Sequence, residues 1–406
     1  MIRRALGGVR SRRSSNAPSA GGPVGGAHRS ARIGNVKIVR VTGWSIHLPY
    51  VEGTYRMSGD RVTTGMDAVV VRVVADDGTI GIGESGTVGV TFDAQHLPGQ
   101  LAGVAALAPA VVGADPRSPH SVHRRMTAAM TGHPYAKAPV DVAVWDLAAR
   151  AAGIPLWQRL GGDGPEETPL YRPVQGATAE AAGANAKKRL DQDYRRLQVK
   201  VGDDPIVDAQ RVLAVRATVG HDVVIFADAN CGFSLSAARR FVRELGADGA
   251  GIFLEQPCAT LADCARLRAS WTGPMVMDET IVSLAALLEA HRLGVADGVT
   301  VKLTRVGGIT PAVTIRDVAV ELGIGVTVED ASGCALADTT FAHMNASTPA
   351  RQRVHTVDFD SWVTITHVEG PSPRDGSVLR PQAEAPGLGL QLREDILGDP
   401  FLDVRA

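Results

Sequence analysis

A regular alternation of short apolar runs and amphipathic stretches is the feature that most limits how this chain can fold. From Leu170 onward, runs rich in β-branched residues recur at intervals of about 25 residues, and a helical pattern separates each run from the next. This repeat predicts an α/β protein with a (β/α)8, TIM-like barrel. The eight runs are LYRPV, LQVKV, VVIFADAN, GIFLEQP, PMVMDE, GVTVKL, GVTVED and RVHTVDF.

The part of the chain before the repeat has a different pattern. Two β-patterned runs, VKIVRVTGWSIHL and DAVVVRVVADDGTIGIGESG, come first, and the second contains an Asp-Asp-Gly hairpin signal. Helical patterns follow at about 94–113, 119–130 and 137–153. We therefore expect an N-terminal α+β capping domain over residues 35–160 and the barrel over 161–369. The Pro- and Gly-containing segment 370–406 is expected to return to the first domain.

Residues 1–34 contain Arg, Ser, Gly and Ala but no acidic residue, and this composition predicts a disordered tail. Such a tail also resembles an organelle transit peptide, but without an apolar helical face a plain extension is the preferred interpretation. The 406 residues carry a formal net charge of -1, which indicates no general attraction to nucleic acid or acidic lipid. No apolar run has the length of a bilayer span, and the four cysteines form no C-x-x-C pair. We expect a cytoplasmic protein without membrane or nucleic-acid partners.

Three carboxylates end successive runs of the repeat. Asp228 ends the third run, Glu255 the fourth and Asp278 the fifth. Since the C-terminal ends of barrel strands meet at one mouth, these side chains should come together and repel one another. A divalent cation relieves that repulsion, and an all-oxygen donor set suits Mg²⁺. The alternative is that each acid caps a nearby helix, but three in consecutive units favour the metal site.

Two of the few lysines lie within apolar runs. Lys200 is in the second run and Lys302 in the sixth. In a ring of eight strands these positions face each other, so the two amines could act as bases on opposite faces of a substrate. A lysine serves as a base near neutral pH only when burial or nearby cations lower its pKa. The alternative is that each lysine only pairs with a metal-site carboxylate.

Further polar residues accompany these positions. Gln198 points to the same side as Lys200 and could contact a substrate carboxylate, or it could belong to the barrel layers. Glu329 and Asp330 end the seventh run, where one of them could bond Lys302 or a cationic substrate group, or cap a helix. The loop beyond, with Ser332 and a glycine at 333, could approach a ligand.

Together these residues predict one class of reaction. The metal would bind a substrate carboxylate and stabilise the enediolate that forms when the α-proton leaves. One lysine would take the proton. Return of a proton by the other lysine gives racemisation or epimerisation, and departure of a β-substituent gives elimination.

The residues and motifs above resemble those of the enolase superfamily, in its mandelate racemase/muconate lactonizing enzyme family. That resemblance implies a capping domain over a modified (β/α)8 barrel, with Asp228, Glu255 and Asp278 as Mg²⁺ ligands. The family carries K-x-K on the second strand and a lysine on the sixth. The corresponding residues here are Gln198-Val199-Lys200 and Lys302.

The segments RLQVKVG, FLEQPCATL, VKLTRVGGIT and PGLGL are similar to a subgroup that acts on proline derivatives. It contains cis-3-hydroxyproline dehydratases and hydroxyproline-betaine epimerases. The resemblance implies that Lys200 and Lys302 form the acid/base pair, that Gln198 touches substrate and that Tyr55 reaches down from the capping domain. Tyr55 could instead pack on the barrel rim. A small amino-acid or carboxylate substrate and a homo-oligomer are also implied.

The chain departs from the subgroup at two places. Ser332 stands where an aromatic residue, often Trp, is expected, and Phe359 lies near a second expected Trp. Because aromatic faces can hold a cationic ring, these changes point to a different or larger amino acid.

Three other functions fit less of the sequence. A dipeptide epimerase or N-acylamino acid racemase would share the chemistry, although Gln198 argues against it. A non-catalytic metal-binding scaffold would be expected to lose a base or a ligand. A dinucleotide enzyme needs G-x-G-x-x-G at the start of a helix, whereas GIGESG at 81–86 opens none.

Overall fold

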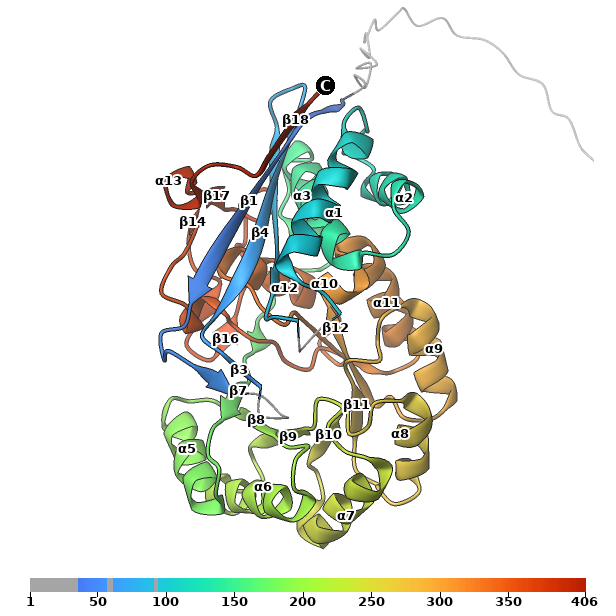
Figure 1. The fold of residues 1–406 in the computed structure, drawn as a ribbon, viewed down its shortest axis with the longest axis vertical. Coiled ribbons are helices and arrows are strands. Elements are labelled where there is room, and N and C mark those ends of the chain that lie inside the picture. Colours follow the sequence, from blue (N-terminus) through green and yellow to red (C-terminus); the bar gives the residue numbers. More distant parts are fainter. Residues whose placement is uncertain (1–35, 57–60, 91–93) are drawn as a thin grey trace, which may run out of the picture. The chain divides into compact units, whose positions relative to one another are not determined.

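The computed structural model describes residues 36–56, 61–90 and 94–406. The tail predicted over 1–34 lies outside the described residues, as does part of the loop that follows Tyr55. The described chain contains two large sheets of different kinds, one parallel and one antiparallel, together with three small antiparallel sheets of two or three strands (Figure 1).

The parallel sheet has seven strands in the order β13-β12-β11-β10-β9-β8-β7. Helices connect the strands and lie on the outer side of the sheet (Figure 1). The predicted α/β barrel class is confirmed. The strands are β7 Arg172–Val174, β8 Arg196–Lys200, β9 Val224–Asp228, β10 Phe253–Glu255, β11 Met275–Met277, β12 Gly298–Lys302 and β13 Gly325–Glu329. The helices are α5 Ala179–Asp191, α6 Pro205–Val219, α7 Leu235–Leu245, α8 Leu261–Arg268, α9 Leu284–Arg292, α10 Leu303–Val306, α11 Ile309–Glu321 and α12 Ala335–Ala346.

The barrel helices begin where the sequence supplies a capping side chain. Ser234, Thr260 and Ser283 each accept a hydrogen bond from the backbone N–H three residues further on. Asp204 does the same at α6, with a proline at the first helical position. These caps satisfy donors that a helix start leaves unpaired, so each strand-to-helix turn is fixed locally.

The eighth run differs from the prediction because RVHTVDF forms no regular strand. It closes the ring through two single parallel bridges, Val326 to Arg353 and Leu170 to Thr356. Thr356 N donates to Pro169 O over 3.0 Å. Pro169 and Pro173 lack the N–H groups that a continuous ladder on this side would need.

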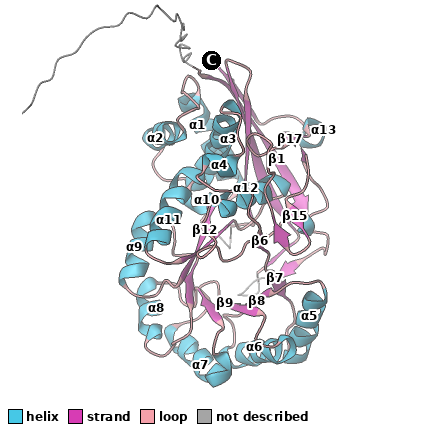
Figure 2. Cartoon of the chain, turned by 180° about the vertical axis from the view of Figure 1, so that it is seen from behind, coloured by secondary structure: helices cyan, strands magenta, loops and turns pink. Residues whose placement is uncertain are grey.

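The antiparallel sheet forms the capping part of the chain, in the order β18-β1-β4-β5 (Figure 2). Its last member comes from the C-terminus, where residues 402–405 pair with 40–43 of β1. A short hairpin, β2 Tyr55–Arg56 with β3 Val62–Thr63, leaves this sheet. The strands and helices are β1 Ile38–Pro49, β4 Gly65–Ala75, β5 Ile80–Thr87, β18 Leu402–Arg405, α1 Leu97–Val111, α2 Pro119–Ala129 and α3 Pro134–Ala151.

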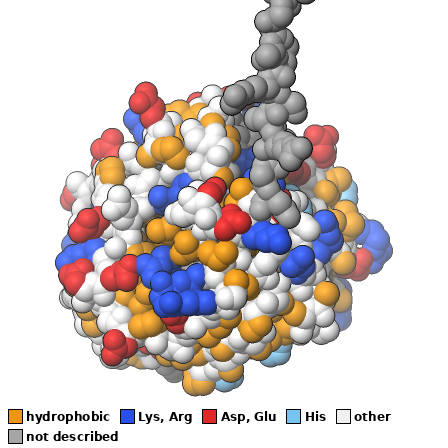
Figure 3. All heavy atoms as spheres, turned by 90° about the horizontal axis from the view of Figure 1, so that it is seen from above, with side chains coloured by type: hydrophobic (Ala, Val, Ile, Leu, Met, Phe, Trp, Pro, Cys, Tyr) orange, Lys and Arg blue, Asp and Glu red, His pale blue; other side chains and the backbone are white. Residues whose placement is uncertain are grey.

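Buried side chains join the capping part to the barrel. Asp141 of α3 accepts hydrogen bonds from Thr310 N and Oγ1, both 2.8 Å, at the start of α11. Glu84 of β5 accepts one from Ala337 N in α12. On the face seen in Figure 3, basic and acidic side chains lie interspersed among apolar ones. No helix among the described residues is both long and apolar enough to cross a membrane.

Candidate active site

A cavity lies at the C-terminal ends of the barrel strands. It brings together all the predicted site residues except Ser332. Aromatic side chains from the capping part and from residues 359–362 complete its wall. The lining residues are Tyr50, Tyr55, Val88, Tyr171, Gln198, Lys200, Asp228, Glu255, Asp278, Lys302, Glu329, Asp330, Ala331, Phe359 and Trp362.

The two lysines line this one cavity from strands that three others separate, β8 and β12. Lys200 Nζ donates to Asp228 Oδ2 at 2.5 Å. Lys302, only 5% exposed, donates to Asp278 Oδ2 at 2.9 Å. The parallel register places Lys200 directly beside Asp228, and Asp228 beside Glu255.

Glu255 occupies the middle of the carboxylate row. Its oxygens accept hydrogen bonds from Gln198 Nε2 at 3.0 Å and from Thr300 Oγ1 at 3.1 Å. Burial raises the pKa of Glu255 well above its ordinary value, and repulsion from Asp228 and Asp278 adds to the increase. The three buried acids therefore repel one another electrostatically.

The pKa values of both lysines are shifted upward, whereas a base near neutral pH was expected to have a lowered pKa. Burial is the largest single effect on Lys200 and lowers its pKa, but the combined attraction of the neighbouring groups, Asp228 first among them, makes the net shift upward. For Lys302, burial again lowers the pKa, and the combined attraction of Asp278, Glu329 and Glu279 reverses it. The surrounding carboxylates together thus favour the protonated form of both amines.

The donor set suits Mg²⁺ in chemistry, since the acids are buried, neighbouring and all-oxygen. Across residues 36–56, 61–90 and 94–406, however, no three His, Cys, Asp or Glu side chains converge closely enough to hold a metal ion. Lys200 engages Asp228, and both Lys302 and Arg305 engage Asp278. Buried oxygens without hydrogen-bond partners, Glu279 Oε2 and Glu329 Oε2, remain in this region.

Several polar neighbours of the site were not found by sequence reasoning. Arg305 Nη1 donates to Asp278 Oδ1 at 2.6 Å. Asn230 Nδ2 donates to Asp228 Oδ2 at 3.1 Å and to Glu279 Oε1 at 3.0 Å. Burial, then repulsion from Asp278, raises the pKa of Glu279 to about 8. The signal available in the sequence was position. Glu279 and Asn230 lie one and two residues after a strand-end acid, and Arg305 lies three residues after Lys302.

Glu329 and Asp330 have different surroundings. Glu329 Oε1 lies 3.9 Å from Lys302 Nζ, and burial raises the pKa of Glu329 to about 7. Asp330 Oδ2 accepts hydrogen bonds from Thr304 N at 2.7 Å and Thr304 Oγ1 at 2.5 Å. Asp330 therefore fixes the turn after Lys302, whereas Glu329 faces the amine.

Ser332 does not line the cavity. Its side chain is buried, and its Oγ has no hydrogen-bond partner. It packs against Gly86 of β5, where an added Cβ would come within 2.2 Å of that oxygen. A tryptophan at position 332 would need a different neighbour on β5.

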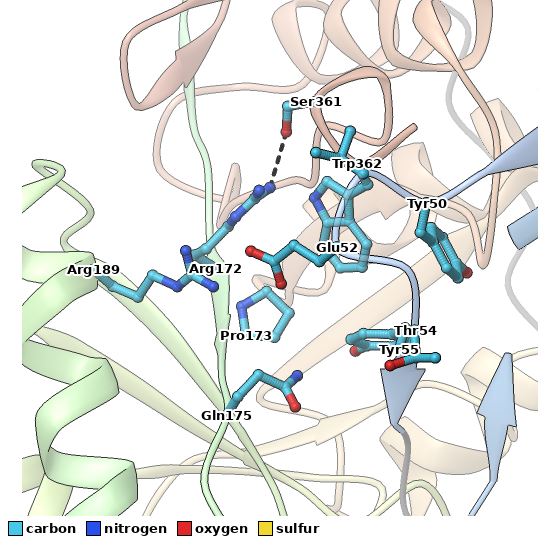
Figure 4. Close-up of a pocket in the computed structure, with 11 residues that line it drawn as sticks. Tyr50, Glu52, Thr54, Tyr55, Arg172, Pro173, Gln175, Arg189, Ser361 and Trp362 are labelled. Atoms are coloured by element: carbon cyan, nitrogen blue, oxygen red, sulfur yellow. Dashed lines mark hydrogen bonds between the residues drawn. The ribbon is translucent and has the colours of Figure 1, made fainter. Parts of the chain in front are cut away.

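Aromatic side chains cover the cavity from the capping side. The rings of Tyr55 and Trp362 lie 5.1 Å apart, and those of Phe359 and Trp362 lie 5.5 Å apart. Trp362 thus supplies an indole close to Phe359, where the sequence pattern had shown none. Arg172 lies over the Trp362 ring (Figure 4), with Cζ 5.1 Å from the ring centroid.

Comparison with known proteins agrees with the fold. Residues 39–161 match the mandelate racemase/muconate lactonizing enzyme N-terminal domain family. Residues 181–396 match the enolase C-terminal domain-like family. A cis-3-hydroxy-L-proline dehydratase from Roseibium aggregatum is 32% identical over 365 residues, which cover 90% of this chain and 99% of the relative.

Other relatives have different names. An N-succinyl-L-Arg/Lys racemase from Bacillus cereus is 30% identical, over 82% of this chain and 89% of the relative. A crystal structure of an enolase-superfamily member from Roseovarius nubinhibens ISM, complexed with magnesium, matches with a TM-score of 0.86 and 31% identity. The match covers 91% of this chain and 100% of that one. The chain belongs to the mandelate racemase/muconate lactonizing enzyme family of the enolase superfamily and is an enzyme of the lyase or isomerase class.

Proposed function

We propose that this enzyme removes the α-proton of a small amino-acid-type carboxylate in a Mg²⁺-dependent reaction and then dehydrates or epimerises a proline derivative. The observation that carries the proposal is that Lys200 and Lys302 line the same cavity as Asp228, Glu255 and Asp278. The relative named cis-3-hydroxy-L-proline dehydratase supports the proline class.

In this proposal, Asp228, Glu255 and Asp278 would hold Mg²⁺, which would supply positive charge that stabilises the developing enediolate and offsets the carboxylates that raise the pKa of both lysines. Glu329, beside Lys302, and Gln198, beside Glu255, are polar contacts for substrate or base. Tyr55 and Trp362 shield the reacting carbon from water.

Two outcomes follow from the same first step. A lysine takes the α-proton as the Cα–H bond breaks. In epimerisation the opposite lysine delivers a proton to the other face. In dehydration the electron pair forms a carbon–carbon double bond, and the β-hydroxyl leaves as water after it receives a proton from a protonated lysine.

The test follows the α-proton in D₂O by NMR with Mg²⁺ and a panel that contains cis-3-hydroxy-L-proline, hydroxyproline betaine and both proline enantiomers. Wild-type enzyme should exchange or eliminate the proton of at least one compound. Lys302→Ala should reduce exchange for at least one enantiomer by about 100-fold or more, because a positioned base contributes that much. Lys187→Ala, an exposed lysine on α5, is the matched control and should behave as wild type.

The same assay separates the alternatives. Turnover confined to dipeptides or N-acylamino acids would replace the proline class with the second candidate. Absence of exchange with every compound, despite Mg²⁺ binding, would favour a non-catalytic scaffold. Full activity in Lys302→Ala and normal metal affinity in Asp228→Asn would overturn the assignment of both residues.

A further inference from the structure

A hydrogen-bond chain crosses from the capping part to the turn that follows Lys302. Its members are Gln100 of α1, Ser85 of β5, Thr304 of α10 and Asp330, directly after β13. All four side chains are buried. Helix α10 lies beside α3 of the capping part (Figure 1). The chain thus joins two parts of the protein at a point next to one of the proposed bases.

Each link of the chain is within hydrogen-bond distance. Thr304 Oγ1 lies 2.5 Å from Asp330 Oδ2 and 3.2 Å from Ser85 Oγ. Gln100 Nε2 donates to Ser85 Oγ at 2.6 Å and to Tyr135 O at 3.0 Å. Because a backbone carbonyl only accepts, the nitrogen of the Gln100 amide, rather than its oxygen, must face Tyr135 O and Ser85.

The available protons give the chain a direction. A hydroxyl has one proton to donate and a carboxylate is the stronger acceptor, so Thr304 donates to Asp330. Ser85 accepts from Gln100 and supplies the proton between the two hydroxyls. Ser85 Oγ also lies 3.3 Å from Tyr135 O, which Gln100 already satisfies. All three donors therefore point toward the carboxylate, and bonds aligned in this way strengthen one another.

The end of the chain fixes the backbone beside the Lys302 amine. Thr304 N also donates to Asp330 Oδ2, at 2.7 Å, so the backbone and the side chain of Thr304 share one carboxylate oxygen. Lys302 lies two residues before Thr304 and ends β12. Its register partner in β13 is Glu329, the residue before Asp330. The carboxylate thus ties together the two strand ends that carry Lys302 and Glu329.

The turn after the other lysine, Lys200, is held in a different way. Asp208 of α6 accepts hydrogen bonds from Gly202 N at 2.9 Å and from Asp203 N at 3.0 Å. Arg211, also of α6, donates to Lys200 O at 2.9 Å. These contacts come from the barrel itself, so the supports of the two lysines have different origins.

We propose that Ser85 and Gln100 are positioning residues for Lys302 and act through Thr304 and Asp330. The capping part then sets where this amine stands relative to the α-carbon, in addition to enclosing the cavity. The inference rests on the proposed function for the role of Lys302 as a base. A displacement of about 1 Å at a reacting group costs on the order of 100-fold in rate, so such a support has a measurable effect.

The experiment compares Thr304→Val, which removes the hydroxyl and keeps the shape, with Thr304→Ser, which keeps the hydroxyl. For the exchange reaction that Lys302→Ala removes, Thr304→Val should lower kcat by about 10- to 100-fold, with KM and Mg²⁺ affinity unchanged. Thr304→Ser should keep the wild-type rate. Thr218→Val, at an exposed hydroxyl of α6, is the matched control.

Two further measurements separate positioning from general support of the fold. Proton exchange from the side of Lys200 should keep the wild-type rate in Thr304→Val, because the barrel holds that turn. Backbone amide exchange, followed by mass spectrometry, should become faster in segment 300–306 and stay unchanged in segment 196–203. Equal losses of kcat on both sides, or the same loss in Thr304→Ser, would overturn the inference.

Ser85→Ala tests the contribution of the capping part itself, and it decides the matter if Thr304→Val does not fold. It should produce the same selective loss of kcat at about 3- to 10-fold, the size of one neutral hydrogen bond. The double variant with Thr304→Val should lose no more than Thr304→Val alone, since Ser85 acts through Thr304. A wild-type rate in Ser85→Ala, or additive losses in the double variant, would contradict a role for the capping part.

The two proposals can fail separately. Faster amide exchange in segment 300–306, without α-proton exchange by any compound, would support the hydrogen-bond chain and overturn the proposed chemistry. An enzyme that exchanges the α-proton at the same kcat in wild type, Ser85→Ala and Thr304→Val would retain the proposed chemistry and overturn the positioning role.

Discussion

At the residue scale, Gln256 shows how one amide arranges the carboxylate row. Its Oε1 accepts hydrogen bonds from Asp278 N at 2.9 Å and from Thr280 N and Oγ1, while its Nε2 donates to Cys258 O. The residue lies directly after Glu255 and has a φ of 31°, a conformation that non-glycine residues rarely adopt. Strain of this kind persists only where surrounding contacts hold it, and it clusters at functional sites.

We predict that Gln256→Ala weakens Mg²⁺ binding by about 10- to 100-fold, because residues that orient metal ligands commonly contribute that much. The measurement is a titration with Mg²⁺ or Mn²⁺ that monitors binding, without reference to turnover. Gln158→Ala, on the exposed face of α4 (Leu156–Arg159), is the control. An unchanged metal affinity would mean that Asp278 needs no support from Gln256.

Single residues also show which parts of the site could be predicted from the sequence and which could not. The strand-end acids and lysines could be located because each interrupts an apolar run, and such runs have a regular spacing. Trp362 and Arg305 were missed because neither ends an apolar run, since Trp362 ends the short 3-10 helix Asp360–Trp362 and Arg305 lies in α10. The sign of the lysine pKa shifts was missed for a related reason. It depends on ion pairs with Asp228 and Asp278 at 2.5 and 2.9 Å, which spacing alone does not give.

At the element scale, helix α11 follows directly after a glycine, and the hydrogen bonds that cap it come from another helix. Gly308 has a φ of 110°, and an added Cβ would lie 2.5 Å from Asp141 Cβ. Asp141 of α3 accepts from Thr310 N and Oγ1 and also contacts His123 Nδ1 at 2.9 Å. A carboxylate at a helix N-terminus satisfies free N–H groups and interacts with the helix dipole.

We predict that Asp141→Ala lowers the free energy of unfolding by about 2–3 kcal/mol, the usual cost of leaving buried donors unsatisfied. Urea denaturation followed by circular dichroism would measure it. Asp191→Ala, at an exposed ion pair on α5, is the control and should cost well under about 1 kcal/mol. Equal losses in the two variants would remove the special role of Asp141.

A second element-scale link predicts a pH effect. Burial, opposed by the hydrogen bond from Ala337 N, raises the pKa of Glu84 to about 8. The folded protein therefore keeps this proton up to about pH 8, whereas the unfolded chain releases it near its ordinary value of 4.5. His367, 3.5 Å away, has its pKa lowered to about 4 by burial, so it is neutral in both states above about pH 7.

Stability contributed by protonated Glu84 is accordingly lost as pH rises toward about 8. We predict that the free energy of unfolding of wild type falls by about 1–2 kcal/mol relative to that of Glu84→Gln between pH 7 and pH 9. The folded and unfolded states differ in protonation over about one pH unit of this interval, and one unit corresponds to about 1.4 kcal/mol. Melting curves at both pH values for the two proteins provide the comparison. A difference that stays constant with pH would show that Glu84 is ionised in the folded protein.

At the scale of the whole molecule, the two ends of the described chain meet in one sheet. The order β18-β1-β4-β5 puts residues from the C-terminus at the edge of the capping sheet. The barrel repeat was visible in the sequence because each unit is local. The pairing of residues 40–43 with 402–405 joins positions hundreds of residues apart, and the Pro- and Gly-rich composition of 370–406 indicated only that the chain returns.

Removal of this edge tests how much the sheet depends on the C-terminus. We predict that truncation after Asp399 lowers the melting temperature by several degrees and promotes aggregation. The deletion exposes unpaired edge groups on β1, removes the ion pair of Arg40 with Asp403 at 2.6 Å, and uncovers Gly43, against which Phe401 packs. Calorimetry and size-exclusion chromatography would measure both effects, and a chain that lacks only Ala406 is the control.

Since no residue of β18 lines the catalytic cavity, Mg²⁺ affinity below the transition should be preserved. Loss of metal binding in the folded truncated protein would instead show that β18 helps to organise the distant carboxylates.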